Sequence, residues 1–440
     1  MILFKRGKTR TPHRKHTAEM PAVRISTPSS VLISTSQHIG APSVPVVKAG
    51  DKVFVGTLIA EAGGYVGAPI HSSVSGTVRG LEEFLTSNGR VLSAIRIDSD
   101  GEMTPDPAIA PPVLTDFESF SAAVRASGLV GLGGAGFPTS VKLDAEKRGL
   151  IKKIIINGAE CEPYITSDTR TMLDDAEWVV KGISYLLKFI SADEVIIGIE
   201  KNKPECISRL GALLLDEPRA KINVLPTKYP QGAEKILIYN ATGLTVPEGK
   251  LPADVGCLVM NVTSVAFLAK YMETGMPLVE KCITVDGSAV ANPMNVIVPI
   301  GTSIGDIIAF AGGYKGEVGK VLYGGPMMGI AIYSTDDPVF KNTNAILALS
   351  PEESRKPKPT ACIHCGRCAA TCPMGLNPTL YAKALKLDDP VDKAARLEAA
   401  KINLCIECGS CSFVCPANRP LVENNKLSKA AVRAAAADKK

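Results

Sequence analysis

Two segments near the carboxyl end of the sequence carry eight of its twelve cysteines in one repeated spacing. Each reads C-x2-C-x2-C-x3-C-P, and the copies lie within "ACIHCGRCAATCPMG" and "LCIECGSCSFVCPAN". Three closely spaced thiolates can wrap three corners of an iron–sulfur cubane, while the fourth thiolate of the run reaches a second cluster. We therefore assign Cys362, Cys365, Cys368 and Cys415 to one [4Fe–4S] cluster, and Cys405, Cys408, Cys411 and Cys372 to the other.

The alternative for these cysteines is a pair of structural zinc sites. A closed zinc site needs only four ligands and usually takes them from paired C-x2-C elements or adds histidine. The third cysteine at the same short spacing favours iron–sulfur instead. Residues 376–403, between the runs, are expected to be helical throughout, and the fourth cysteine of each run is expected to start a helix. The sequence thus predicts an α-helical ferredoxin domain over residues 356–440.

A glycine-rich loop, "GLVGLGGAGFPTSVKL", is the second candidate site. Its glycines, Gly131, Gly133, Gly134 and Gly136, let backbone N–H groups approach a phosphate or a flat ring. A helix is expected to start near Pro138, with an amino end that favours anions. The bare G-x-G-x-x-G pattern is weak evidence for a dinucleotide site because a helix, and not a strand, precedes it. A plain flexible loop is the alternative.

Two carboxylates follow the next expected strand, in "NGAECEPYITSD". Glu160 and Glu162 would lie where a parallel sheet binds its ligands. Carboxylates there could hydrogen-bond ribose hydroxyls or repel the extra phosphate of NADP; an exposed turn is the alternative. Cys161, between them, is interpreted as a small side chain that packs in an apolar environment, and not as a reactive thiol.

The elements around these motifs alternate between helix and strand. Helices are expected at 117–128, 169–190, 204–216 and 231–243, and strands at 151–160, 193–200, 220–228 and 256–262. This order predicts a Rossmann-like parallel sheet with helices on both faces, over residues 116–275.

The flanking segments predict two further units, giving a multidomain α/β chain. Residues 1–102 read as short strands of a β barrel-sandwich like that of biotinyl and lipoyl carriers, without a carrier lysine, so we interpret them as scaffold. Residues 276–345 are like a β-grasp module of the soluble-ligand-binding kind. Proline-rich stretches at 103–116 and 350–360 separate the units.

Composition narrows the class of protein. The net charge is +5, too small to indicate nucleic-acid binding, and no apolar segment is long enough to span a bilayer. Twelve cysteines without an export signal favour a reducing, cytoplasmic compartment. The basic runs "FKRGKTRTPHRKH" and "KLSKAAVRAAAADKK" are expected to be solvated arms, with docking to an acidic partner or membrane surface as the alternative.

These motifs together resemble known families. "GLGGAGFPTSVKL" followed by "NGAECEP" resembles the signature of the flavin- and NADH-binding 51-kDa subunit of respiratory complex I, over residues 117–333. With "SQHIGAPSVPVVKAGDKV", "APIHSSVSGTV" and the two cysteine runs, the whole chain resembles the C subunits of Rnf-type ion-translocating ferredoxin:NAD oxidoreductase complexes.

The resemblance implies particular cofactor contacts. Carried over by position, it implies an FMN bed at Gly131, Gly133, Gly134, Gly136 and Lys142, with Asn157 and Glu160 facing the isoalloxazine and Glu162 facing the nicotinamide nucleotide. The segment "KYPQGAEK" adds Tyr229, Gly232 and Glu234, and "MNVT" adds Asn261. The chain departs from the family pattern at Ala159, Ala233, Met260 and Thr263, which puts individual contacts in question.

The implied function is electron transfer. Hydride would pass between NAD(H) and FMN, and single electrons between FMN and the two clusters, with no side chain needed as catalytic acid or base. In Rnf-type complexes, electron transfer between ferredoxin and NAD⁺ is coupled to ion transport. The resemblance implies that the chain is peripheral, on the cytoplasmic face of the cell membrane. It would contact the membrane through other membrane and iron–sulfur subunits of the complex.

Three alternatives stay open. A cobalamin reductase of a metabolic microcompartment also joins a flavin domain to two ferredoxin runs, and the NADH-binding subunit of a hydrogenase or formate dehydrogenase shares the flavin domain. The long barrel-sandwich disfavours both. The third alternative, from a different class, is a non-redox zinc-binding scaffold.

Overall fold

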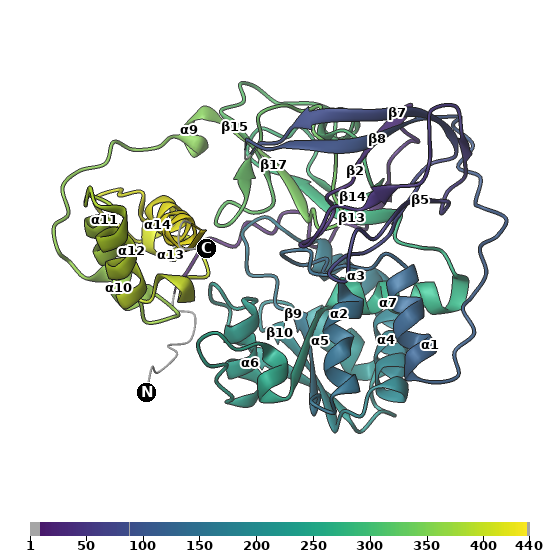
Figure 1. Ribbon diagram of the computed structural model, residues 1–440, viewed down its shortest axis with the longest axis horizontal. Helices are drawn as coiled ribbons and strands as arrows, with labels where there is room; N and C mark the ends of the chain where they lie inside the picture. The colour runs from purple at the N-terminus through teal and green to yellow at the C-terminus, as the bar shows by residue number, and fades with distance from the viewer. Residues whose placement is uncertain (1–8, 88, 438–440) are drawn as a thin grey trace.

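The computed structural model describes residues 9–87 and 89–437. Figure 1 shows a β-rich part above, a sheet flanked by helices below, and a helical unit at the carboxyl end that joins the rest through an extended segment. In the described part of the chain, no helix is long and apolar enough to cross a membrane.

The barrel-sandwich consists of two small antiparallel sheets. One has the order β2-β8-β7-β4, from Ser30–Ser34, Val91–Ser99, Gly76–Leu85 and Lys52–Val53. The other joins β3 (Val44–Pro45), β5 (Leu58–Glu61) and β6 (Ile70–His71). Alternate apolar residues such as Ile33, Ile59 and Ile95 fill the space between them. The predicted β-rich amino-terminal unit is thereby confirmed.

The central unit is the predicted parallel sheet. Its order is β11-β10-β9-β12, and every neighbouring pair is parallel. The strands are Ala220–Leu225, Glu194–Glu200, Lys153–Gly158 and Cys257–Asn261. The continuous apolar runs of β9 and β10 are buried because helices cover both faces of the sheet.

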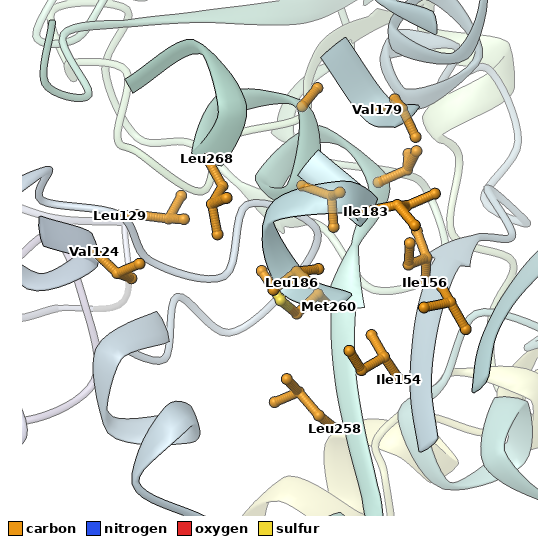
Figure 2. Close-up of a cluster of buried hydrophobic side chains, with 14 of the residues drawn as sticks. Val124, Leu129, Ile154, Ile156, Val179, Ile183, Leu186, Leu258, Met260 and Leu268 are labelled. Atoms are coloured by element: carbon orange, nitrogen blue, oxygen red, sulfur yellow. The ribbon is translucent and has the colours of Figure 1, made fainter. Parts of the chain in front are cut away.

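The helices of this unit pack their apolar stripes against the sheet. They are α1 (Phe117–Ala126), α2 (Thr139–Lys147), α3 (Ser167–Asp174), α4 (Ala176–Phe189), α5 (Pro204–Leu213), α6 (Glu234–Thr242) and α7 (Val262–Thr274), with a short 3-10 helix at Pro252–Val255. Figure 2 shows Ile183 and Leu186 of α4 among side chains from β9 and β12. This core fixes the carboxyl edge of the sheet.

Two helices that the sequence predicts as continuous are each broken. The predicted helix 169–190 divides into α3 and α4 at Asp175, whose φ and ψ are −113° and 23° and whose carboxylate pairs with Lys270 at 2.8 Å. Aspartate favours helix ends because its side chain competes for backbone groups. The predicted helical stretch 376–403 divides into α11 (Pro378–Ala384), α12 (Pro390–Ala399) and a 3-10 turn at Ile402–Leu404, because Pro390 can only begin a helix.

The β-grasp unit has a six-stranded sheet in the order β1-β14-β13-β17-β15-β16. Its own strands are β13 (Glu280–Asp286), β14 (Met294–Pro299), β15 (Lys320–Tyr323), β16 (Ile330–Ala331) and β17 (Ala345–Leu349), with α8 (Ile304–Phe310) packed against them. The edge strand β1 (Val23–Arg24) comes from the beginning of the chain and pairs parallel with β14.

The prediction of a solvated amino-terminal arm is wrong for residues 9–16. Thr9 forms a two-way backbone pair with Tyr229, Lys15 Nζ donates to the Glu160 and Glu162 carbonyls, and His16 contacts Asp286 at 3.2 Å. These side chains are fixed because buried carboxylates and carbonyls on later parts of the chain partner them. Residues 4–8 of the basic run lie outside the described residues. In Figure 1 residues 9–16, in purple, pass beside the yellow helical unit.

The carboxyl-terminal unit is helical, as predicted. Beyond α9 (Pro351–Ser354) it contains α10 (Arg367–Thr371), α11, α12, α13 (Ser410–Phe413) and α14 (Leu421–Ala437). The second basic run lies largely in α14, which buries Asn425, Ser428 and Val432 against the unit, so it is not a free arm up to residue 437.

The fourth cysteine of each run ends a helix, so the prediction that it starts one is wrong. Cys372 caps the carboxyl end of α10, and Cys415 follows α13. Each is followed by proline, which disfavours a helical conformation at the residue before it.

Candidate cofactor sites

One set of four predicted cluster ligands surrounds a single cavity. Cys405, Cys408, Cys411 and Cys372 all line it, and Met374, Leu376 and Val422 complete its apolar wall. Burial raises the pKa of Cys411 to about 12 and that of Cys372 to about 11. These thiols therefore ionise only when a metal compensates the charge, which couples their deprotonation to metal binding.

Hydrogen-bond donors surround the sulfur atoms of this set. Asn425 Nδ2 lies 3.4 Å from Cys405 Sγ and 3.9 Å from Cys411 Sγ, and the Glu407 amide donates to Cys405 Sγ at 3.4 Å. Such donors stabilise thiolate charge and tune the potential of a bound cluster. The donor set fits a [4Fe–4S] cluster.

The other set lies nearer the surface. Cys368 is buried beside Cys415 and Leu421, whereas Cys365 is exposed. Desolvation, together with the charges of Cys415 and Cys362, raises the pKa of Cys368. Cys362, Cys368 and Cys415 of this predicted cluster are thus neighbours, and Cys365 is open to solvent.

The two cysteine runs adopt the same local backbone. His364 and Glu407, each following the first cysteine by two positions, have φ of 55°, and Gly366 and Gly409 have φ of 73° and 76°. In the described residues, no three Cys, His, Asp or Glu side chains are grouped closely enough to hold one metal ion. A cubane binds its four thiolates through four different irons, which suits the repeated C-x2-C-x2-C spacing of the two runs.

The glycine-rich loop lies against the amino end of α7. Asn261 caps that helix by accepting the Thr263 amide at 2.9 Å, and a Cβ on Gly133 would overlap the Asn261 side chain. A Cβ on Gly134, by contrast, would meet no atom within 4 Å. The loop therefore leaves open space above Gly134 while it packs tightly at Gly133, which fits a flat ligand lying over the loop.

Lys142 lies one turn into α2, as predicted. Its Nζ is 3.1 Å from the Val259 carbonyl and 3.3 Å from Glu234 Oε1. The structure therefore brings Lys142 and Glu234 together at the edge of the sheet near β12.

The Glu160 carboxylate is buried and fully engaged by protein donors. Oε1 accepts the Asp168 amide at 2.7 Å, and Oε2 accepts Lys203 Nζ at 3.0 Å and Thr169 Oγ1 at 2.7 Å. Desolvation opposes its ionisation, but Lys203 and Lys15 outweigh that effect and lower the pKa of Glu160. Glu160 thus holds its loop in place, and its predicted contact with the flavin stays a prediction.

Glu162 lies under a loop of the β-grasp unit. Its Oε2 accepts the Met327 amide at 3.0 Å, and its Oε1 lies 3.4 Å from the Tyr229 hydroxyl. Burial raises the pKa of Glu162 to about 7. A Cβ on Gly325 would overlap the Glu162 side chain, so this glycine is required for the close approach.

Asn157 joins the two loops that carry the remaining predicted residues. Its Nδ2 donates to the Gly232 carbonyl at 2.9 Å, and a Cβ on Gly232 would overlap the Ala159 carbonyl. Asp168 connects this group to the glycine loop, since its carboxylate accepts Asn261 Nδ2 at 2.9 Å and Thr263 Oγ1 at 2.8 Å. These contacts bring Asn157, Gly232 and Asn261 together at the carboxyl edge of the sheet, beside the loop that carries Glu160 and Glu162.

Three residues of this region are absent from the sequence prediction. Lys15 Nζ donates to the carbonyls of Glu160 and Glu162, each at 2.8 Å. Lys203 and Asp168 hold Glu160 from the other side. Lys203 follows β10 and could have been found from its place beyond a strand's carboxyl end. Lys15 gives no such local signal.

The helical unit contacts this region through its buried cysteine set. A Cβ on Gly409 would lie 2.6 Å from the Met327 carbonyl, and the Met327 amide holds Glu162. Ile236 of α6 packs among Met374 and Leu376, and Thr9 Oγ1 lies 2.8 Å from Thr371 Oγ1. The set containing Cys408 thus faces the candidate flavin region, while the set containing Cys365 faces outward.

Comparison with known families covers most of the chain. Residues 2–102 match the RnfC barrel sandwich hybrid domain, 124–270 the Nuo51 FMN-binding domain, 282–331 the SLBB domain and 358–419 the 4Fe-4S dicluster domain. These matches confirm the predicted fold class and the cofactor classes, FMN and two [4Fe–4S] clusters. The exact domain boundaries stay predictions.

The chain is also similar to whole proteins. It is 43% identical over 382 residues to the C subunit of a Na(+)-translocating ferredoxin:NAD(+) oxidoreductase complex from Acetobacterium woodii, covering 86% of each chain. It is 39% identical over 384 residues to the C subunit of the proton-translocating complex from Clostridium ljungdahlii, covering 86% of this chain and 83% of that protein. The C subunit of an ion-translocating oxidoreductase complex from Rhodobacter capsulatus is 39% identical over 375 residues, covering 83% of this chain and 72% of that protein.

A solved structure shares the fold. The NAD+-reducing [NiFe]-hydrogenase in its H2-reduced state superposes with a TM-score of 0.51 at 19% identity, covering 72% of this chain and 63% of that one. The chain matches the RnfC barrel-sandwich domain and is 39–43% identical to these C subunits over most of its length. The cobalamin-reductase, hydrogenase and zinc-scaffold alternatives do not predict these two findings. The chain belongs to the family of C subunits of ion-translocating ferredoxin:NAD(+) oxidoreductase complexes.

Proposed function

We propose that this chain exchanges electrons between NAD(H) and the other subunits of a membrane-bound ion-translocating complex. When bound, FMN would accept or donate hydride and the two clusters would carry single electrons. The observation that supports this most directly is the junction at Glu162. There the predicted nicotinamide residue, the Tyr229 hydroxyl and the loop that meets Gly409 beside Cys408 lie together.

The chain's own residues would bind and orient the flavin. The open space over Gly134 would take the ring or its phosphate arm, and Asn261, fixed by Asp168, would border it. The amino end of α7 adds a favourable field for a phosphate. Asn157 would lie beside the ring at the loop it holds to Gly232.

Electrostatics in this region would keep the flavin-facing loop rigid. Glu160 is ionised and compensated by Lys203 and Lys15, so it adds little net charge. Glu162, with a pKa of about 7, would be present both ionised and protonated near neutral pH. It could therefore accept a hydrogen bond from the nicotinamide nucleotide when ionised, or donate one to it when protonated.

We further propose an order for the clusters. The cluster of Cys405, Cys408, Cys411 and Cys372 would be proximal to the flavin, and that of Cys362, Cys365, Cys368 and Cys415 distal. The exposed Cys365 supports an outward, partner-facing role for the distal cluster. Other membrane and iron–sulfur subunits would dock there, with the chain on the cytoplasmic face of the membrane.

An anaerobic NADH titration tests the function and the order together. In the wild type, NADH should bleach the flavin and then produce the electron paramagnetic resonance signals of both clusters. In Cys365→Ser the proximal signal should persist, whereas in Cys408→Ser the flavin should bleach and neither signal should grow. Flavin that NADH leaves oxidised in the wild type would refute the function, and a distal signal that survives in Cys408→Ser would refute the order.

A further inference from the structure

The two cysteine runs share the same sequence around their first three cysteines except at two positions. They read "CIHCGRC" and "CIECGSC", so His364 and Arg367 of the first run correspond to Glu407 and Ser410 of the second. His364 and Arg367 are exposed, whereas Ser410 is buried and its Oγ lies 3.5 Å from Cys408 Sγ. The two runs therefore place different polar groups beside their sulfur atoms.

Asn425 of α14 adds a second polar group to the proximal cysteine set. Its Nδ2 lies 3.4 Å from Cys405 Sγ and 3.9 Å from Cys411 Sγ, and the residue lines the cavity that the proximal cysteines surround. Asn425 is only 2% exposed, and its Oδ1 has no hydrogen-bond partner among the described residues. The amide thus turns its donor side to the sulfur atoms and leaves its acceptor side unpaired.

This position of Asn425 is unfavourable unless the sulfur atoms carry negative charge. Asparagine is a weaker helix former than leucine or alanine, and Asn425 lies inside α14. An unpaired buried acceptor costs about 1–3 kcal/mol in addition. A hydrogen bond to an ionised acceptor is roughly twice as strong as one between neutral groups, so a cluster-bound thiolate would offset these costs.

The distal cysteine set lacks such donors. Within residues 9–87 and 89–437, no side chain donates a hydrogen bond to a sulfur atom of this set. Cys365 is exposed, so water can stabilise charge on a cluster there. The proximal set has an apolar wall, and an electron added behind that wall would be disfavoured without polar partners.

We propose that Asn425 and Ser410 raise the reduction potential of the proximal cluster and so keep this enclosed cluster reducible. Reduction adds one negative charge to a cluster, and part of that charge resides on the cysteine sulfur atoms to which both groups donate. The two side chains thereby do for the proximal cluster what water does for the distal one. This inference rests on the proposed function and adds the residues that control one step of the electron path.

Reductive titration of the full-length holoprotein with dithionite, followed by electron paramagnetic resonance, tests the proposal. Dithionite reduces the clusters without NADH or flavin, and the signal that persists in Cys365→Ser identifies the proximal cluster. Asn425→Leu, which has a similar volume and no donor, should lower the proximal midpoint potential by about 59 mV and leave the distal potential unchanged. This shift is a tenfold change in a one-electron reduction equilibrium.

Two further variants complete the experiment. Ser410→Ala removes only the hydroxyl oxygen and should change the proximal equilibrium a few-fold in the same direction. Asn424→Leu is the matched control, because it makes the same substitution at the preceding position of α14 and lies outside the cavity wall. It should titrate as the wild type does. The iron and sulfide content of each variant shows whether both clusters have assembled.

Three results would overturn the proposal. These are equal proximal potentials in Asn425→Leu and Asn424→Leu, an equal shift of both clusters in Asn425→Leu, or an unshifted proximal potential in Ser410→Ala. The last result decides the matter if Asn425→Leu fails to assemble its cluster. Failure of NADH to bleach the flavin in the wild-type sample would instead refute the proposed function, because the dithionite titration does not depend on it.

Discussion

Gly133 and Gly134 are neighbours in one loop, but a methyl group would meet different surroundings at each. At Gly133 it would displace Asn261, which caps α7 and bonds Asp168. We therefore expect Gly133→Ala to lower the melting temperature and the FMN content together. Losing the cap alone costs about 1 kcal/mol.

Gly134→Ala is the matched variant. Its Cβ would enter open space, so the melting temperature of the cofactor-free protein should match that of the wild type. If the flavin lies over the loop, FMN affinity should nevertheless fall about tenfold, as measured by fluorescence quenching. Unchanged FMN affinity in Gly134→Ala would show that the flavin does not lie over this part of the loop.

Glu200 should make stability depend on pH. Burial raises its pKa from about 4.5 to about 7. The folded chain then binds this proton more tightly than the unfolded chain, so the contribution is complete below about pH 4.5 and is lost as the pH rises through about 7. We expect Glu200→Gln, which cannot ionise, to melt a few degrees above the wild type at pH 8. The corresponding free energy is at most about 3 kcal/mol.

The advantage of Glu200→Gln should fall to less than half at pH 5.5 and disappear below about pH 4.5, where the wild-type carboxyl is neutral in both the folded and the unfolded chain. Glu205→Gln, at an exposed position of α5, serves as the control and should shift the melting temperature equally at both pH values. An advantage of Glu200→Gln that is the same at pH 5.5 and pH 8 would contradict a raised pKa.

At the scale of elements, α4 and α7 cross closely at a glycine. A Cβ on Gly182 would overlap the Val265 carbonyl and would therefore push the two helices apart. Alanine favours helix by about 1 kcal/mol over glycine, but at this position we expect the clash to outweigh that gain. Gly182→Ala should lower the melting temperature.

Gly211 of α5 provides the opposite case. A Cβ there would meet only Ile222 Cδ1, at an ordinary distance of 3.7 Å. Gly211→Ala should therefore raise stability by about 0.5–1 kcal/mol. If both variants raise the melting temperature, helix propensity and not the α4–α7 contact controls the outcome.

The elements that the sequence predicts are those with local signals. The strands β9 and β10 are runs of buried β-branched residues, and the cysteine spacing specifies its cofactor without long-range information. The break at Asp175 was missed because apolar residues recur at helical spacing on both sides of it, whereas the break at Pro390 does carry a local signal, the Asp-Asp-Pro sequence. The docking of residues 9–25 was missed because Lys15 meets Glu160 across 145 positions, a pairing that only the folded chain reveals.

At the scale of the whole molecule, one of the contacts between the helical unit and the rest of the chain is made at Gly409, against Met327. Gly409 and Gly366 occupy equivalent positions in the two cysteine runs, with φ of 76° and 73°. A side chain would be equally strained at both. Only at Gly409 would it also press on Met327, since nothing lies within 4 Å at Gly366.

We therefore expect Gly409→Ala to slow cluster reduction by NADH in stopped-flow experiments at least about tenfold, while flavin reduction continues. Gly366→Ala carries the same backbone strain without the contact and should transfer electrons close to the wild-type rate. Similar rates in the two variants would show that the Met327 contact does not control transfer.

The beginning of the chain contacts parts that are made much later. Residues 9–24 pair with Tyr229, Glu160, Asp286, β14 and Thr371. During synthesis, residues 9–24 must therefore wait without these partners until the later residues, up to Thr371, have been made. Such long-range closure is slow and leaves intermediates exposed to aggregation. Residues 9–24 can thus complete their full set of contacts only after Thr371 of the helical unit has emerged.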